Sequence, residues 1–132
     1  MSFDFFEDDI ILYENQQPII ELMREDNQGQ SLDAHISLNR LFINSPRNNL
    51  LIRFNSYNKT LVIADIFFNR RQGYGTRLLE ILNEFAKKHG YKKLMLEFAH
   101  TEQIRMFALK RGFRLIDDDP NDRYQSNWYL QI

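Results

Sequence analysis

The strongest constraint on the fold is a strand, a turn and a helix that follow one another in the middle of the chain. Residues 60–69 form an apolar run rich in β-branched and aromatic side chains, which predicts a buried strand. Residues 76–90 read as a helix that ends in a basic turn and in Gly90, a residue typical of a left-handed cap. The apolar positions of this helix fall on one face: Leu78, Leu82, Phe85 and Ala86.

The turn between this strand and helix carries positive charge where a helix normally prefers acids. Arg70 and Arg71 precede the helix, Arg77 lies in its first turn, and no acidic residue stands there. Gly73 and Gly75 would let an anion approach the free backbone amides closely. The sequence therefore predicts an anion site at the start of the helix, and the alternative is a glycine-rich turn with solvated arginines.

Two common phosphate-binding motifs do not fit this turn. A P-loop needs Gly-Lys-Ser/Thr after its first glycine, and the chain lacks that tripeptide here. A dinucleotide fingerprint needs a third glycine where this chain has Leu78. A dinucleotide-binding domain therefore remains only as a third, less favoured interpretation.

The pattern Arg70-x-x-Gly73-x-Gly75 resembles the acetyl-CoA pyrophosphate loop of the GNAT N-acetyltransferase superfamily. A strand at residues 92–98 follows the helix, and a second helix then ends before a Gly-Phe pair at residues 112–113, as in that family. The resemblance covers about residues 60–132 and is weaker before them.

The resemblance implies a single GNAT-like domain over residues 1–132. Its α/β fold would be a mixed, mostly antiparallel sheet with a central parallel strand pair and two main helices. Residues 1–59 would form an N-terminal meander on the acceptor side, and residues 60–132 would form the acetyl-CoA-binding core.

The remaining elements are predicted from periodicity and turn residues. Strands are expected at residues 10–13, 50–54, 113–116 and 124–132, and a second helix is expected from Thr101 to Arg111. Residues 19–23 fit either a strand or one helical turn, and residues 32–43 alternate like a strand. The strand at 92–98 should lie parallel to the strand at 60–69, because a helix connects them.

Composition narrows the class of protein. The formal net charge is −1, so bulk charge does not imply a nucleic-acid partner. There is no cysteine, no run long enough to cross a membrane, and no basic leader at the acidic start. We therefore expect a cytoplasmic protein without a membrane partner.

The resemblance also implies where the cofactor would bind. Backbone amides of the glycine loop would hold the pyrophosphate, the two arginines would add charge, and the end of the strand would flank the pantetheine arm. These positions are, in chain order, Phe67, Phe68, Arg70, Arg71, Gln72, Gly73, Tyr74, Gly75 and Thr76.

Three residues are candidates for the chemistry. Asp65 is a carboxylate inside an apolar strand, where burial would raise its pKa and suit it to act as a base, although a structural hydrogen bond explains it equally well. Glu97 is a second acid, and Thr101 stands where the family often has an asparagine. Ala108 occupies the position of the family's usual general-acid tyrosine and cannot donate a proton.

The other polar residues read as structural. His35 and His89 have no spacing typical of metal ligands, and His100 is more typical of a loop than of an active site. The acidic residues 117–122 lack the spacing and closing glutamate of a calcium loop. No metal site is therefore predicted.

The predicted function is N-acetyl transfer from acetyl-CoA, as cosubstrate, to a primary amine of a small molecule or peptide, by direct attack in a ternary complex. The alternative is a catalytically weak or inactive GNAT-like module that binds acyl-CoA and acts through a protein or nucleic-acid partner, an interpretation that Ala108 favours. The last strand could also pair across a homodimer.

Overall fold

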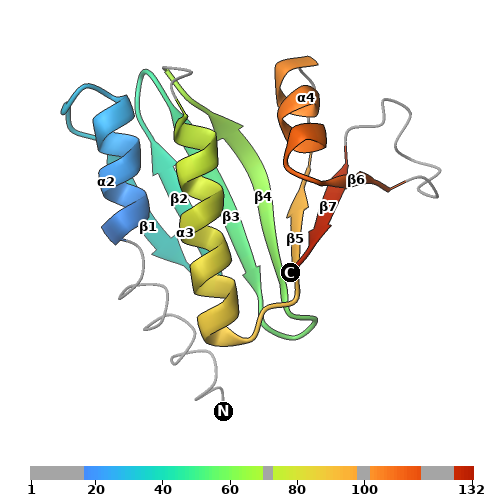
Figure 1. Ribbon diagram of the computed structural model, residues 1–132. Coiled ribbons are helices and arrows are strands. Elements are labelled where there is room, and N and C mark those ends of the chain that lie inside the picture. The colour runs from blue at the N-terminus through green and yellow to red at the C-terminus, as the bar shows by residue number, and fades with distance from the viewer. Residues whose placement is uncertain (1–16, 70–72, 98–101, 117–126) are drawn as a thin grey trace, which may run out of the picture.

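The computed structural model describes residues 17–69, 73–97, 102–116 and 127–132, and these build one mixed sheet with helices packed on it (Figure 1). The described sheet is seven-stranded, in the order β1-β2-β3-β4-β5-β7-β6. Its strands are β1 (Asp33–Ser37), β2 (Arg40–Asn44), β3 (Asn49–Asn55), β4 (Thr60–Phe67), β5 (Lys93–Leu96), β6 (Arg114–Leu115) and β7 (Trp128–Gln131). The described helices are α2 (Gln17–Asp26), α3 (Tyr74–His89) and α4 (Glu102–Lys110).

The strand directions confirm the predicted sheet. β4 and β5 lie parallel, with Ile63 beside Leu96, and α3 makes the crossover between them. Every other described pair of neighbours is antiparallel. The sheet is therefore mixed and mostly antiparallel, with its parallel pair near the middle.

The α2 helix contains residues 19–23, for which the sequence allowed either a strand or a helical turn. It is a third helix beside the two main helices that were expected. Residues 19–23 belong to a helix of 10 residues, so the strand interpretation was wrong. Pro18 does not break this segment, because it lies in the first turn, where its missing N–H costs nothing. Ile19, Ile20, Leu22 and Met23 are buried, so helical packing and not local alternation decides the structure.

The alternating stretch at residues 32–43 is two strands and not one. β1 and β2 pair antiparallel around a tight turn, in which Leu38 has a positive φ of 58°. Leu38 is an unusual residue for that conformation, which glycine or asparagine normally adopts. The position with positive φ therefore carried no sequence signal, and the apolar alternation continued across the turn.

The core lies between the sheet and the pair formed by α2 and α3, which cover the same face and run antiparallel (Figure 1). The predicted apolar face of α3 is confirmed, because Leu78, Leu82, Phe85 and Ala86 are all buried. Ile52, Leu61 and Ile63 meet them from the sheet. α4 lies apart from this pair, beyond the carboxyl end of β5 (Figure 1).

Both ends of α3 are glycines in the left-handed region. Gly73 precedes the helix with φ 86°, and Gly90 ends it with φ 77° while its backbone N–H donates to the carbonyl of Ala86. A residue with a Cβ is strained in that conformation, so the sequence fixes the length of α3 at both ends. The predicted cap at Gly90 is confirmed.

Several predicted features lie outside the described residues: the strand at 10–13, the start of the second helix at Thr101, and the first residues of the last strand. Within the described ranges, no helix is both long enough and apolar enough to span a membrane.

The packing of α3 gives a first prediction. Leu82→Ala should lower the free energy of unfolding by about 2–5 kcal/mol, because Leu82 is fully buried and its loss leaves a cavity between helix and sheet. Glu84→Ala, an exposed position on the same helix, is the matched control and should change it by less than about 0.5 kcal/mol. Urea denaturation measures both, and equal losses in the two variants would contradict this packing.

Candidate functional site

The two parallel strands separate halfway along β4. Their pairing ends at Ile63 and Leu96, after which the N–H of Glu97 still donates to the carbonyl of Ile63 over 3.0 Å. β4 nevertheless continues to Phe67. A register shift against β3 coincides with this point, because the neighbours of Leu51 and Ile52 on β4 are two residues apart. Ala64 is the extra residue of this β-bulge, which turns the end of β4 away from β5.

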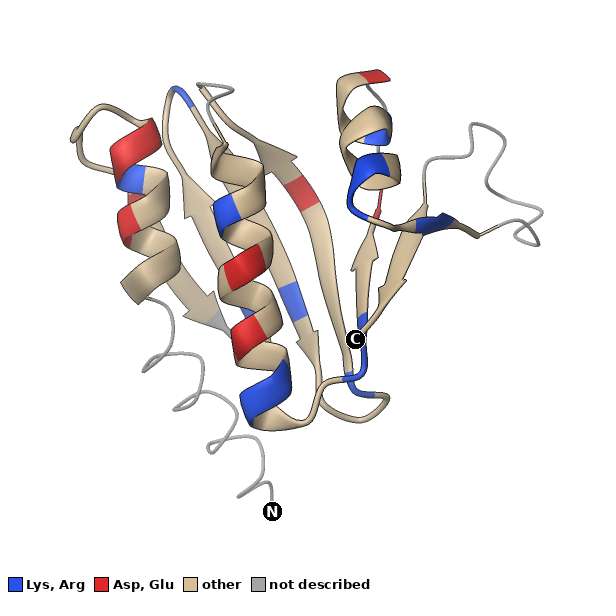
Figure 2. Ribbon diagram, viewed as in Figure 1, with Lys and Arg blue, Asp and Glu red and all other residues tan. Residues whose placement is uncertain are grey.

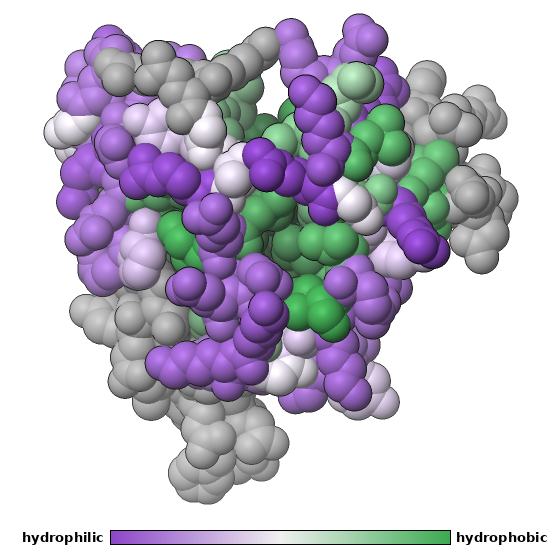
Figure 3. Space-filling view, in the orientation of Figure 1, coloured by the Kyte–Doolittle hydropathy of each residue, from purple (hydrophilic) through white to green (hydrophobic). Residues whose placement is uncertain are grey.

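A cleft of about 790 Å³ opens at this separation. It is lined by the end of β4 (Ile66, Phe67 and Phe68), by residues 73–76 at the start of α3, and by one side of α4. Hydrophobic surface is visible deep in the hollow and hydrophilic residues surround it (Figure 3). Ligands of parallel sheets bind at the carboxyl ends of the strands, and the cleft lies at that end of β4 and β5.

The N-terminus of α3 lines this cleft and has the properties of an anion-binding site. Its first turn contains no acidic residue, and no side chain caps it. The amides of Tyr74, Gly75 and Thr76 lie in the first turn, where a helix gives N–H groups no partner of its own. A Cβ built on Gly73 would meet no atom within 4 Å, so space is open beside these amides. Partial positive charge and open space together favour a bound phosphate.

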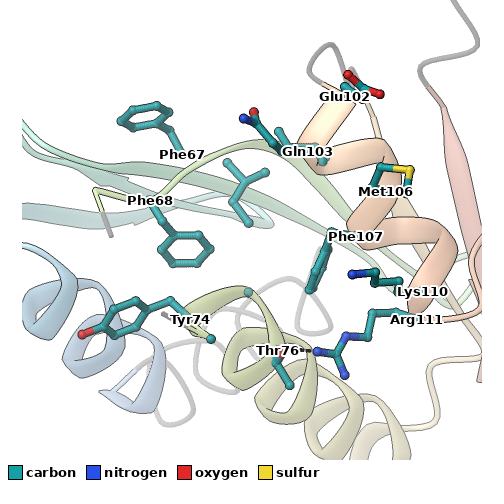
Figure 4. Close-up of a pocket in the computed structure, with 14 residues that line it drawn as sticks. Phe67, Phe68, Tyr74, Thr76, Glu102, Gln103, Met106, Phe107, Lys110 and Arg111 are labelled. Carbon is teal, nitrogen blue, oxygen red and sulfur yellow. Dashed lines mark hydrogen bonds between the residues drawn. The ribbon is translucent and has the colours of Figure 1, made fainter. Parts of the chain in front are cut away.

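The absence of a side chain at Gly75 has a reason that the sequence did not reveal. A Cβ on Gly75 would lie 3.1 Å from the Cζ atom of Phe107, whose ring extends from α4 toward the start of α3 (Figure 4). Gly75 therefore lets the two helices approach each other across the cleft. This close approach adds to the role first inferred for it, which was access of an anion to the backbone.

Two cations at the end of α4 reach the same place. Lys110 and Arg111 line the cleft, and the Arg111 guanidinium donates to the hydroxyl of Thr76 (Figure 4). The same guanidinium lies 5.4 Å from the centre of the Phe107 ring. The sequence placed Arg111 at the end of the second predicted helix and gave neither cation a role in the site. Their position directly before the Gly-Phe pair at 112–113 was the available signal.

The positive charge of Arg77, which contributed to the prediction of an anion site, is paired within the protein. Its guanidinium pairs with the carboxylate of Glu25 on α2 over 2.8 Å and lies 5.4 Å from the centre of the Tyr74 ring. The hydrogen bond to Glu25 raises the pKa of the Arg77 guanidinium above its ordinary value. Arg77 thus serves the contact between α2 and α3.

The aromatic residues beside the cleft lie on both faces of β4. Phe68 stacks on Tyr74, with ring centres 6.0 Å apart, which fixes the start of α3 against the end of the strand. Phe67 points the other way and is 57% exposed at the edge of the cleft (Figure 4). Both side chains line the cleft, so the end of β4 contributes apolar surface to it.

Asp65 is exposed, so the expected burial within an apolar strand was wrong. It lies opposite Leu51 in the register, while the flanking Leu50 and Ile52 are buried under the helices. The Asp65 side chain therefore lies on the other face of the sheet, outside the residues that line the cleft. A base at this position would have to reach an acceptor that approaches from that outer face.

Glu97 lies on the same outer face and already has a partner. Its carboxylate pairs with the guanidinium of Arg53 on β3, and its side chain is 20% exposed. The pair spans β4, because β4 separates β3 from β5. The carboxylate of Glu97 is therefore already engaged in an ion pair, which makes Glu97 a less suitable candidate for a base than Asp65.

Ala108 is fully buried and does not line the cleft. Position 108 therefore supplies no proton donor to the cleft, because alanine has no proton to give and its side chain does not line the cleft. The remaining site candidates, Arg70, Arg71, Gln72, His100 and Thr101, lie outside the described residues, as does the acidic stretch 117–122. Among described residues, no group of three His, Asp or Glu side chains could hold a metal ion.

Comparison with known proteins agrees with this geometry. The profile of the acetyltransferase (GNAT) family matches residues 50–113, which run from β3 to the Gly-Phe pair just after α4. No curated protein matches the sequence.

The fold is similar to those of solved acetyltransferases. A GNAT-family acetyltransferase from Staphylococcus aureus has a TM-score of 0.55 and 14% identity, over 91% of this chain and 92% of that one. A streptothricin acetyltransferase homologue from Bacillus anthracis was solved with acetyl coenzyme A. It has a TM-score of 0.52 and 19% identity, over 76% of this chain and 82% of that one. This chain spans 64% of the length of nourseothricin acetyltransferase, whose TM-score of 0.49 at 20% identity over 70% of this chain is too low to support a common fold.

The contact between Gly75 and Phe107 can be tested by a double-mutant cycle. Gly75→Ala should stabilise the Phe107→Leu variant by about 0.5–1 kcal/mol, because alanine favours a helix over glycine. In the wild type this gain should be lost, since the new methyl group presses on the Phe107 ring. The measurement is urea denaturation of the four proteins.

The matched control for this cycle is Leu109→Ala, an exposed position on the same helix. It should leave the effect of Gly75→Ala unchanged. An effect of Gly75→Ala that is the same with phenylalanine and with leucine at position 107 would show that the two helices do not meet there.

Proposed function

This chain belongs to the GNAT acetyltransferase superfamily, and we propose that it moves an acetyl group from acetyl-CoA to a primary amine by direct attack in a ternary complex. The observation that carries the proposal is the open, acid-free N-terminus of α3 at the inner end of an apolar cleft. Such a site suits a ligand with a charged pyrophosphate and a long, mostly apolar arm. The complex of the Bacillus anthracis protein with acetyl coenzyme A supports the same cosubstrate.

In this proposal the pyrophosphate binds the amides at the start of α3. Lys110 and Arg111 add positive charge from the opposite side of the cleft. The backbone of Phe67 and Phe68 lies beside the pantetheine arm. The end of β4 has no β5 residue beside it after Ile63, so it offers backbone groups for the amides of that arm. We keep Arg70, Arg71 and Gln72 as further proposed ligands of the phosphates.

The transfer itself requires little from the protein. A neutral amine nitrogen attacks the thioester carbonyl, the new C–N bond forms, the C–S bond breaks, and the sulfur leaves as a thiolate that takes a proton from water. Asp65 is the proposed base for the proton that the amine loses, because it lies on the outer face beside the cleft. Glu97 and Thr101 are secondary proposals, and Glu97 comes after Asp65 because its carboxylate already pairs with Arg53.

A specific observation keeps the second candidate function open. Ala108 offers no proton donor and lies buried away from the cleft. A module that binds acyl-CoA but transfers slowly or not at all, and that acts through a protein or nucleic-acid partner, is consistent with that position.

Beyond the chemistry, we propose that residues 1–132 form one domain. Its first 59 residues would face the acceptor, a small molecule or a peptide, and residues 60–132 would hold the cofactor. A cytoplasmic location and a homodimer are further proposals. The last strand, β7, already pairs with β5 and with β6, so β6 and not β7 forms this edge of the described sheet.

Incubation of the protein with acetyl-CoA and a panel of primary amines tests the function. Release of free thiol that depends on one of the amines, with a matching mass increase of that amine, is the expected result. Binding of acetyl-CoA without thiol release from any amine would favour the second candidate. Binding of NAD in place of acetyl-CoA would contradict both.

A matched pair of variants can separate the role of Gly73 in cofactor binding from the effect of its backbone conformation on stability. Gly73 and Gly29 both have positive φ, and a Cβ on either would meet no atom within 4 Å. Gly73→Ala and Gly29→Ala should each cost about 1 kcal/mol of stability. Only Gly73→Ala should weaken acetyl-CoA binding, by about tenfold, because only it disturbs the amides of α3. Calorimetric titration measures the affinities, and equal affinities would place the phosphate elsewhere.

Removal of the proposed base gives a separate prediction. Asp65→Asn should lower kcat by about 100-fold and leave acetyl-CoA affinity unchanged, since Asp65 lies outside the cleft. Asp33→Asn, an exposed acid on β1, is the control and should keep full activity. A fully active Asp65→Asn variant would remove Asp65 as the base.

A further inference from the structure

The end of α2 carries charge of the sign that a helix C-terminus disfavours. Glu25 and Asp26 are its last two residues, although carboxylates there lie against the negative end of the helix dipole. The C-terminal end of α2, with acidic residues shown in red, lies beside the N-terminal end of α3 (Figure 2). The unfavourable position of these acids calls for compensation by other groups.

Asp26 is a carboxylate with no exposed surface. Its Oδ2 atom accepts a hydrogen bond from the backbone N–H of Asn69 over 2.7 Å and another from the side-chain amide of Asn48 over 2.9 Å. The Asn69 side chain in turn donates to the carbonyl of Asp26 over 3.3 Å. Asp26 therefore fixes the chain directly after β4, where hydrogen bonds to a buried charge are short and strong.

Asn48 holds Asp26 from its other side. Asn48 is buried, and its amide donates both to Asp26 and to the carbonyl of Met23 over 2.8 Å. Ser45 completes the turn by donating to the Asn48 side-chain oxygen over 2.7 Å. The carboxylate is thus positioned by the turn between β2 and β3, and it does not depend on the cofactor for its place.

Glu25 makes the second connection. It pairs with Arg77 in the first turn of α3. Asn69 is the last described residue before the glycine loop, and Arg77 stands four residues after Gly73. Two consecutive acids of α2 therefore contact the chain on both sides of the proposed pyrophosphate site.

We infer that Glu25 and Asp26 are positioning residues for the cofactor: they set the distance between the end of β4 and the N-terminus of α3, and thereby the affinity for acetyl-CoA. This inference rests on the proposed function. It assigns to α2, which lies outside the cleft, a part in cofactor binding. It also explains why Arg77 turns to α2 and leaves the phosphates to the cations of α4.

The test is calorimetric titration of the full chain with acetyl-CoA, for the wild type, Asp26→Asn and Glu25→Gln. Asp26→Asn should weaken binding about tenfold, because a neutral amide accepts the Asn69 N–H less strongly. Glu25→Gln removes an exposed pair and should leave Tm nearly unchanged. It should weaken binding about twofold at low salt, and the difference from the wild type should disappear in 1 M salt, which screens such a pair.

Ile20→Val is the matched control for stability. Ile20 is buried on the same helix, so its truncation loosens α2 and leaves in place the side chains that bond to Asn69 and Arg77. It should lower Tm and keep wild-type acetyl-CoA affinity at a temperature where all the proteins are folded. A loss of affinity in Ile20→Val equal to that in Asp26→Asn would show that α2 matters only for stability, and would overturn the inference.

Three other outcomes of the titration separate this inference from the proposed function. If the wild type binds acetyl-CoA and both acid variants bind it equally well, the inference fails and the proposed function stands. If the wild type binds no acetyl-CoA, both fail together. If Asp26→Asn does not fold, the Glu25→Gln comparison at low and high salt decides alone, because that variant changes an exposed pair.

Discussion

The site depends on the point where β4 and β5 stop pairing. A parallel pair that continued to Phe67 would place β5 beside the whole of β4 and leave no cleft. The register shift at Ala64 instead turns the strand end away after Ile63. The cost is a short stretch of β4 whose backbone has no β5 partner, and such groups in a partly apolar cleft favour a ligand that can hydrogen-bond to them.

Helix ends supply the second constraint. α3 begins without an acid and α2 ends with two, so each helix by itself carries charge of the wrong sign at that end. The structure places these two ends together, and the pair between Glu25 and Arg77 offsets part of the imbalance. The amides of α3 remain available to a ligand, and Lys110 and Arg111 lie on the opposite side of the cleft. Cofactor binding and the contact between helices thus use different cations.

The sequence predicted what depends on short-range pattern. The parallel strands, the apolar face of α3 and its cap at Gly90 follow from periodicity and from glycine conformation. What depends on distant contacts could not be predicted. The burial of Asp26 requires Asn48 and Asn69 to meet it, and the exposure of Asp65 follows from a bulge that shifts which face it takes. The role of Gly75 against Phe107 likewise joins two helices that lie far apart in sequence.

The central claim is that the N-terminus of α3 holds the phosphates of acetyl-CoA. An amide-resolved NMR titration of the labelled protein with acetyl-CoA tests it most directly. We predict that the largest shifts fall on the amides of Gly73, Tyr74, Gly75 and Thr76, and that the same concentration of NAD leaves them unchanged. Saturable binding that shifts other amides and spares these four would contradict the account, and so would shifts at these four caused equally by NAD.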